Sequence, residues 1–204
     1  QYVLHAEIFF DPQTHTMRNI EREMVLKGIF LAMAKAERSS GISSRLIFCI
    51  LRHVDIVNGL DTVTVAEHYK DKFKDVLIGV GLDSSEMGFP PHQYKDIFDR
   101  ARTVGFPPVA HAGEEGPLDY VWEALDILKI NRLDHGNRLL EDDALLQRLA
   151  DEGLALTVCP LTNLKLQVVD DMQNHPLRLM LEKGLKVTVN SDDPAYFGGF
   201  INEN

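Results

Sequence analysis

Hydrophobic and polar positions alternate along this chain between two kinds of segment. Short runs rich in Val, Ile, Leu and Phe are each followed by a polar turn and then by a longer stretch with apolar residues at helical spacing. This repetition predicts β-strands that alternate with α-helices around a parallel sheet. The predicted strands are Val3–Phe10, Arg45–Leu51, Val76–Leu82, Pro108–Ala112, Arg132–His135, Leu154–Cys159 and Lys186–Asn190. The predicted helices are Glu21–Glu37, Asp61–Lys74, Gln93–Val104, Leu118–Lys129, Asp142–Ala150 and Pro176–Lys183.

Polar side chains at the strand ends distinguish between the two folds that fit this repetition, a (β/α)8 barrel and a doubly wound open sheet. Most predicted strands end in ionisable or amide groups, namely Glu7, Asp11, Arg52, His53, Asp83, Glu86, His111, Glu114, Asp134, His135, Asn163, Asp192 and Asp193. In a barrel, functional groups gather at the carboxyl ends of all strands, whereas an open sheet concentrates them near one crevice. We therefore predict one barrel domain over residues 1–204.

Composition and charge narrow the function classes. The chain has 204 residues, 45% hydrophobic and 25% charged, which is ordinary for a globular protein. Its formal net charge of −10 and its lack of a dense basic run disfavour nucleic-acid binding. The apolar runs fall far short of the roughly 20 residues that cross a bilayer. Cys49 and Cys159 lie within apolar runs, which predicts free thiols in a reducing cytoplasm.

The first candidate site is the segment from Val109 to Gly116. Alternation along the strand places His111 near its carboxyl end, facing the barrel mouth, and Gly113 allows a turn that brings Glu114 close to it. A metal-ligating histidine beside a proton-transferring carboxylate requires this proximity. The alternative is a structural histidine followed by an acidic helix start.

The second candidate site is the segment from Lys186 to Pro194. Alternation directs Thr188, Asn190 and Asp192 to the barrel interior, where polar groups are costly unless they are hydrogen-bonded or bound to a ligand. Asp192 then faces a cation and Asp193 a substrate. The alternative is an Asp-Asp-Pro turn that caps a helix.

Two further segments are ambiguous by themselves. His135 lies in an Asp-His-Gly segment, and a lone histidine beside an aspartate is more often structural than functional. Ser84, Ser85 and Glu86 follow a glycine-containing strand that lacks the dinucleotide fingerprint. They either hydrogen-bond a small polar ligand or cap a loop.

Four motifs, in order along the chain, resemble the adenosine/adenine deaminase family of metal-dependent barrel hydrolases. They are His111–Glu114, Asp134–Gly136, Cys159–Asn163 and Asn190–Pro194. The segments Phe9–His15 and Gly81–Glu86 are similar to the adenine deaminase branch of that family.

The resemblance implies a role for each of five residues. His111 and Asp192 would ligate one Zn²⁺ per active site, and Glu114 would donate a proton to N1 of the purine. His135 would orient or deprotonate the attacking water, and Asp193 would hydrogen-bond N7. The implied reaction is hydrolytic deamination of adenine to hypoxanthine and ammonia in purine salvage. Adenosine and N6-substituted adenines are the alternative substrates.

The sequence also departs from the family pattern. The family carries a His-x-His pair of metal ligands on its first strand, and no His-x-His occurs in these 204 residues. Val3–Phe10 resembles the family's second strand, and the chain stops just after the eighth. The resemblance therefore implies an incomplete (β/α)8 barrel, from strand 2 to strand 8, without the closing helices. An alternative hypothesis is an inactive fragment that cannot hold the metal alone.

Overall fold

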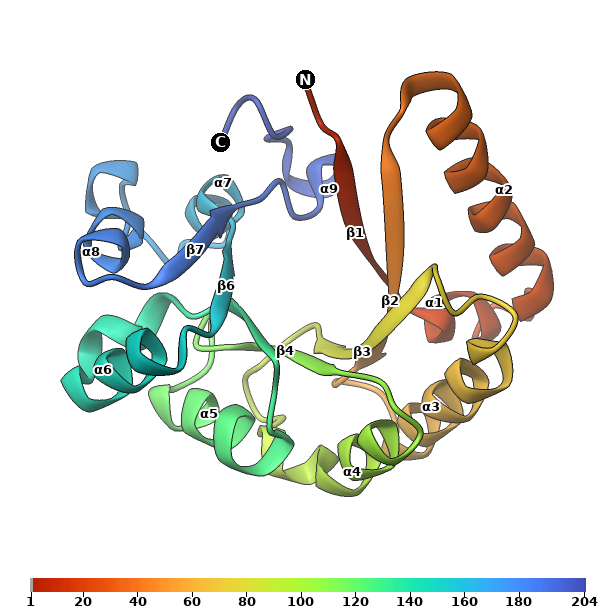
Figure 1. Cartoon of the computed structure of the whole chain (residues 1–204). Helices are drawn as coiled ribbons and strands as arrows, with labels where there is room; N and C mark the ends of the chain where they lie inside the picture. Colours follow the sequence, from red (N-terminus) through yellow and green to blue (C-terminus); the bar gives the residue numbers. More distant parts are fainter. Residues whose placement is uncertain (1) are drawn as a thin grey trace. The chain divides into compact units, whose positions relative to one another are not determined.

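The computed structural model describes residues 2–204 and divides them into two compact units (Figure 1). The N-terminal unit comprises residues 2–84 and 96–108, and the C-terminal unit comprises residues 85–95 and 109–204. Both units are built from parallel strands and helices that alternate along the chain, as the sequence predicts. The single domain over residues 1–204 stays a prediction.

The N-terminal unit contains a three-stranded parallel sheet in which β1 pairs with β2 and β2 with β3. The strands are β1 (His5–Phe10), β2 (Ser43–Leu51) and β3 (Leu77–Asp83). The helices are α1 (Pro12–Thr16), α2 (Arg22–Ser40), α3 (Ile56–Lys70) and α4 (Lys95–Thr103), whose first residue belongs to the other unit. The central strand β2 is buried from Leu46 to Ile50, each side chain at most 1% exposed, because helices cover it.

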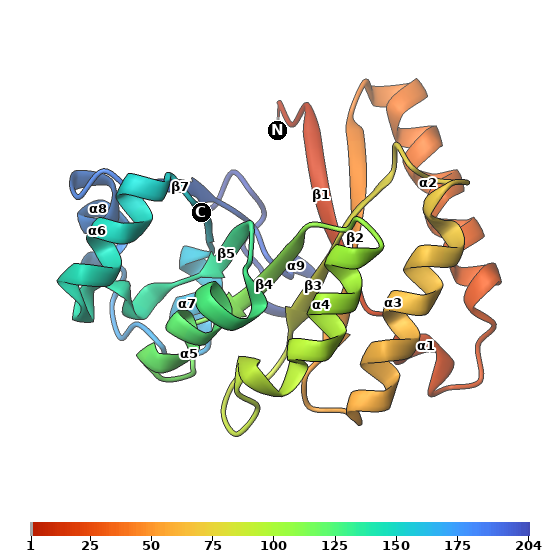
Figure 2. The ribbon, with the colours of Figure 1, turned by 60° about the horizontal axis from the view of Figure 1, so that its bottom comes forward.

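The C-terminal unit contains four parallel strands, which also pair in chain order (Figure 2). They are β4 (Pro108–Ala112), β5 (Arg132–His135), β6 (Ala155–Val158) and β7 (Lys186–Val189). The α-helices are α5 (Leu118–Glu123), α6 (Asp143–Glu152), α7 (Pro160–Lys165), α8 (Leu177–Glu182) and α9 (Pro194–Phe197). Shorter helical turns are η1 (Pro91–Tyr94), the π-helical η2 (Ala124–Leu128), η3 (Asn137–Glu141) and η4 (Met172–Asn174).

Helix α6 shows how local sequence sets an element's bounds. The Asp142 carboxylate accepts hydrogen bonds from the backbone N–H groups of Ala144 and Leu145, at 2.9 and 3.2 Å, and so caps the first turn. Gly153 ends the helix with a φ of 63°, a left-handed conformation that glycine adopts without steric cost. Between the caps, Leu145 and Leu149 are fully buried, and each contributes about 1.5–3 kcal/mol through burial.

All seven predicted strands are confirmed, and each boundary lies within two residues of its predicted position. Four predicted helices differ. Helix α2 ends at Ser40 rather than Glu37. Helix α3 spans Ile56–Lys70 rather than Asp61–Lys74; Asp55 caps its first turn, and the apolar residues of that turn are exposed. The predicted helix over 93–104 begins as the 3₁₀ turn η1, and that over 118–129 changes to the π-helical η2. Helices α1, α7 and α9, none longer than six residues, are additional.

Strand order within each unit bears on the fold class. The strands pair in chain order, without the reversal that marks a doubly wound sheet. This order is the one found in a (β/α)8 barrel. None of the helices within residues 2–204 combines the length and the apolar composition that crossing a membrane requires.

Candidate active site

Four of the five predicted site residues converge in the C-terminal unit. One ligand atom from each of His111, Glu114 and His135 lies within 4.8 Å of the others. A second group, His135, Cys159 and Asp192, meets the same limit and shares His135 with the first. Asp193 follows Asp192 at the start of α9, and its side chain is exposed. The structure therefore gathers the carboxyl ends of β4, β5, β6 and β7 around His135.

The parallel pairing of β4 and β5 places the two histidines side by side. Ala112 is opposite His135 and His111 is opposite Asp134, and the two imidazole rings meet edge to face with centroids 4.6 Å apart. His135 and Asp192 both have a left-handed backbone, with φ of 67° and 53°. Glycine adopts this conformation at less steric cost, although histidine and aspartate adopt it more often than most other residues do.

Glu86 holds the loop that carries Glu114. One oxygen of its buried carboxylate accepts hydrogen bonds from the backbone N–H groups of Gly113 and Gly116, at 3.1 and 2.7 Å. The other oxygen accepts from the N–H of Glu114, at 3.2 Å. A side chain on Gly116 would collide with Glu86, because its Cβ would lie 2.4 Å from that carboxylate. Of the two predictions for Glu86, the capped loop is the one that the structure bears out.

The Glu114 carboxyl is buried and hydrogen-bonded. It is 9% exposed, and its Oε1 accepts a hydrogen bond from Asn163 Nδ2 at 2.8 Å. The same Oε1 lies 3.1 Å from His135 Nδ1. Burial raises the pKa of Glu114 to about 7; the His135 charge opposes this rise, and the charges of Asp192 and Glu86 add to it. Glu114 is therefore partly protonated at neutral pH, as a general acid must be.

The pKa of His135 is set by opposing effects. Burial disfavours the charged imidazole, but the carboxylates of Glu114, Asp192 and Asp134 outweigh it and raise the pKa. Asp134 itself is tied to its neighbours, since its Oδ1 accepts hydrogen bonds from Arg132 and Thr157. These carboxylates therefore make His135 a stronger proton acceptor than an exposed imidazole.

Asp193 and Cys159 differ in what they offer. Asp193 precedes α9 but makes no side-chain capping hydrogen bond, so the predicted alternative of a helix cap lacks its characteristic bond. Desolvation of its carboxyl and the neighbouring charge of Asp192 raise the pKa of Asp193. Burial raises the pKa of the Cys159 thiol, and the charges of Asp192 and Glu114 raise it further. This thiol is therefore protonated at neutral pH.

The polar stripe on β7 is largely satisfied by hydrogen bonds within the sheet. Thr188 donates from its hydroxyl to the carbonyl of Leu156 at 3.2 Å. Asn190 donates from Nδ2 to the Thr188 hydroxyl and carbonyl, at 2.9 and 3.0 Å. Only Asp192, the last residue of the stripe, is left with a carboxylate directed to the cluster around His135.

Two residues that sequence reasoning did not assign to the site also belong to it. Asn163, on α7, is fully buried and contacts Glu114. His175 is 8% exposed, and its Nε2 lies 3.2 Å from Asn163 Oδ1. His175 lies in an irregular segment outside any predicted element, so no periodicity could place it near Glu114. Asn163 lies in one of the four motifs, but its position in that motif did not indicate a function for its side chain.

The donor atoms of this cluster match the preferences of zinc. Imidazole nitrogen, carboxylate oxygen and thiolate sulfur are the ligands that Zn²⁺ takes in proteins. His111 lies in one of the two groups, Asp192 and Cys159 lie in the other, and His135 is common to both, so the two groups together contain these residue types. The chemistry of the donor set therefore fits a zinc ion.

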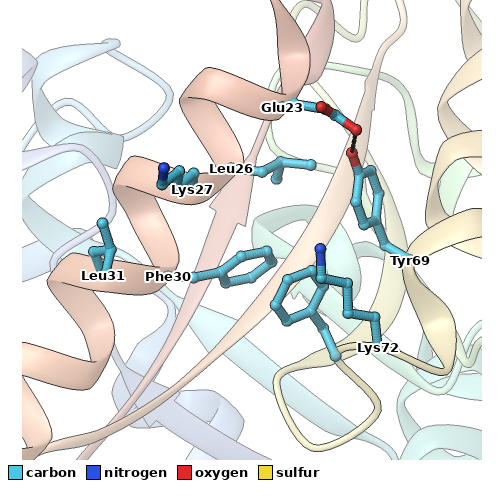
Figure 3. A pocket seen from close by; sticks show the side chains of 8 residues that line it. Glu23, Leu26, Lys27, Phe30, Leu31, Tyr69 and Lys72 are labelled. Atoms are coloured by element: carbon cyan, nitrogen blue, oxygen red, sulfur yellow. Dashed lines mark hydrogen bonds between the residues drawn. The ribbon is translucent and has the colours of Figure 1, made fainter.

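A separate cavity of about 480 Å³ lies in the N-terminal unit (Figure 3). It is lined by Glu23, Leu26, Lys27, Phe30, Leu31, Tyr69, Lys72 and Phe73. The Phe30 and Phe73 rings stack with centroids 3.8 Å apart, and the Tyr69 hydroxyl donates a hydrogen bond to Glu23. No predicted site residue lines this cavity, so it is distinct from the cluster around His135.

Comparisons with known proteins agree on one family. The adenosine deaminase family matches residues 1–204. The adenine deaminase of Rhodospirillum rubrum is 59% identical over the whole chain, which covers 60% of that protein. The crystal structure of an adenine deaminase from Arthrobacter aurescens superimposes with a TM-score of 0.92 and 44% identity, covering 99% of this chain and 61% of that one. A zinc-bound amidohydrolase from Burkholderia ambifaria has a TM-score of 0.88 and 32% identity, covering 98% and 56%.

These matches bear on fold and family. The chain spans about 60% of the length of the curated relatives it matches. The superposition confirms the predicted fold class, an incomplete (β/α)8 barrel, of which the described residues form seven strands. The family match extends over all 204 residues. The chain therefore belongs to the adenosine deaminase family.

Proposed function

We propose that the whole protein hydrolyses adenine to hypoxanthine and ammonia. The observation that carries this proposal is the buried Glu114 carboxyl, with a pKa of about 7, beside the donor cluster around His135. Adding hydroxide to C6 of an aminopurine requires a proton at N1, and a neutral carboxylic acid is the group that can supply it. The relatives named adenine deaminase support the choice of adenine.

His111 and Asp192 are the residues we propose as ligands of a single zinc ion. The family's enzymes are metal-dependent deaminases, and the Burkholderia relative contains zinc. A zinc ion bound here supplies hydroxide at neutral pH, since zinc lowers the pKa of water from 15.7 to about 7.

The remaining site residues transfer protons or form a hydrogen bond to the substrate. Glu114 transfers its proton to N1 of adenine and becomes a carboxylate. His135 orients the attacking water and accepts the proton that the water loses. Asp193, which follows the proposed ligand Asp192 directly, hydrogen-bonds the purine at N7. His135 then gives its proton to the departing amino group, and the Glu114 carboxylate takes the proton of the new C6 hydroxyl, so ammonia leaves and the acid form of Glu114 is restored.

The substrate is a small purine base, and we propose a cytoplasmic role in purine salvage with no nucleic-acid or membrane partner. The buried free thiols Cys49 and Cys159 support a reducing compartment. The net charge of −10 supports a neutral base in preference to a phosphorylated one.

Ammonia release by the full-length enzyme tests the proposal. We expect turnover of adenine, loss of turnover after dialysis against a zinc chelator, and recovery on adding Zn²⁺. Adenosine and N6-methyladenine, supplied separately under the same conditions, test the alternative substrates. Turnover of adenosine without turnover of adenine would contradict the proposal.

A further inference from the structure

Asn163 is buried at the centre of a hydrogen-bonded chain that ends on Glu114. Its Nδ2 lies 2.8 Å from Glu114 Oε1, and its Oδ1 lies 3.2 Å from His175 Nε2. Asn163 is fully buried and His175 is 8% exposed, so solvent does not compete for these bonds. An amide has one donating and one accepting end, and either can face Glu114 unless a neighbour selects the orientation.

His175 makes that selection. Its Nδ1 accepts a hydrogen bond from the backbone N–H of Leu177, at 3.1 Å. A neutral imidazole that accepts at Nδ1 carries its hydrogen on Nε2 and donates there. Burial lowers the pKa of His175 and so favours this neutral ring. The Nε2 hydrogen then points to Asn163 and requires an oxygen in that position.

The orientation of Asn163 determines which oxygen of Glu114 receives a donor. With Oδ1 turned to His175, the Nδ2 group donates to Glu114 Oε1. His135 Nδ1 lies 3.1 Å from the same Oε1, and it is a second donor when its hydrogen is on Nδ1. An oxygen that accepts two hydrogen bonds is the carbonyl oxygen of the neutral acid, so the acid hydrogen resides on Oε2.

We propose that His175 and Asn163 are positioning residues that direct the transferable proton of Glu114 to Oε2. The inference deepens the proposed function, on which it rests, because it assigns the atom from which N1 of the purine is protonated. Oε2 of Glu114 gives its proton to N1, and the electron pair of the O–H bond remains on the carboxylate. His175 acts only through Asn163.

Two substitutions of His175 separate positioning from simple packing. In His175→Gln, the side-chain amide reaches the place of Nε2 and keeps the donor to Asn163. In His175→Asn, the shorter amide keeps an acceptor for the Leu177 N–H but loses the donor. We expect full-length His175→Gln to keep kcat near that of the wild type. We expect His175→Asn to lower kcat about tenfold to a hundredfold with little change in KM, the range for a lost buried hydrogen bond to an ionisable group.

Asn163→Asp is the second test, because it replaces the donating nitrogen with an oxygen of nearly the same size. We expect a comparable loss of kcat at unchanged zinc content, together with a lower melting temperature of the full-length enzyme, because the new carboxyl is buried beside that of Glu114. Equal kcat for both His175 variants, or a lower kcat for His175→Gln than for His175→Asn, would overturn the inference. If the wild type does not deaminate adenine, the proposed function fails instead, so the two failures are distinguishable.

Discussion

Glu114 is held at its backbone and at its side chain by different residues. The Glu86 carboxylate accepts hydrogen bonds from the backbone N–H groups of Gly113, Glu114 and Gly116. Asn163 donates a hydrogen bond to Oε1 of Glu114. Two buried carboxyl groups this close repel when both are charged, and Glu86 is among the charges that raise the pKa of Glu114. The same contacts that fix the loop therefore also favour the acid form.

Replacing Glu114 with glutamine tests its role as the acid. The amide keeps the size of the side chain and an oxygen that can accept from Asn163, but it has no proton to transfer. We expect kcat of the full-length enzyme for adenine to fall by about 10²–10⁴, the usual contribution of general acid catalysis. Steady-state kinetics measure this loss, with zinc content as a control. A kcat within a few-fold of the wild type would exclude Glu114 as the acid.

His175 also predicts how stability depends on pH. Its pKa is lowered in the folded protein, so below a pH of about 6.5 the unfolded chain binds a proton that the folded protein does not. The free energy of unfolding therefore decreases as the pH falls below that value, by at most about 1.4 kcal/mol per pH unit from this group.

Urea unfolding of the wild type and of His175→Gln, at pH 7.5 and pH 5.5, measures the contribution. All other titrating groups are common to both proteins. We expect the wild type to lose more stability between the two conditions. Identical losses would show that His175 does not titrate differently on folding.

Sequence reasoning identified those site residues whose place on a strand end suffices. His111, His135 and Asp192 each end or follow a parallel strand, and parallel strands bring their carboxyl ends together. For Glu86 the sequence leaves two roles open, ligand binding and loop capping, because its partners are backbone N–H groups, which leave no pattern in the sequence. His175 was missed, since its contact with Asn163 depends on the path of an irregular segment.

At the scale of elements, apolar runs predicted the strands well because a buried parallel strand needs apolar residues on both faces. Helices were predicted less well where their faces are exposed. At the start of α3, the side chains of Ile56, Val57 and Leu60 are 45%, 69% and 48% exposed. The helical spacing of buried apolar residues therefore begins several residues after the helix itself. The short helices α7 and α9 span too few turns to show a period.

The loop after β4 makes a second element-scale prediction. In Gly116→Ala, the new methyl would lie 2.4 Å from the Glu86 carboxylate and 2.7 Å from the Tyr120 ring, so the loop must shift. Displacing a catalytic group by about 1 Å lowers kcat on the order of a hundredfold. The matched control is Gly28→Ala on α2, where nothing lies within 4 Å of the added carbon.

We expect Gly28→Ala to leave kcat unchanged and to increase the free energy of unfolding by roughly 0.5–1 kcal/mol, the helix preference of alanine over glycine. Kinetics and urea unfolding of both full-length variants supply the comparison. Unaltered kcat in Gly116→Ala would mean that the loop tolerates a shift, and that Glu86 does not control Glu114.

At the scale of the whole molecule, the net charge of −10 acts on charged ligands but not on a neutral one. Adenine is uncharged at neutral pH, so its association is not steered. We expect kcat/KM for adenine to change by less than about twofold between 20 and 500 mM NaCl, which screens such fields. The affinity for adenosine monophosphate, a charged ligand, is measured at the same salt concentrations for comparison. A steep decline for adenine with salt would point to a local positive field at the site.

The left-handed backbones of His135 and Asp192 link activity to stability. Selection for folding alone would replace such residues with glycine or asparagine, which adopt this conformation at less cost. Asp192→Asn also removes the negative charge that raises the pKa of Glu114 and Asp193, so it should raise the melting temperature of the protein without added zinc while abolishing turnover. Redesign of this protein for stability alone would therefore tend to replace these residues and abolish activity. Sequence libraries screened for thermal stability should keep His135 and Asp192 unchanged.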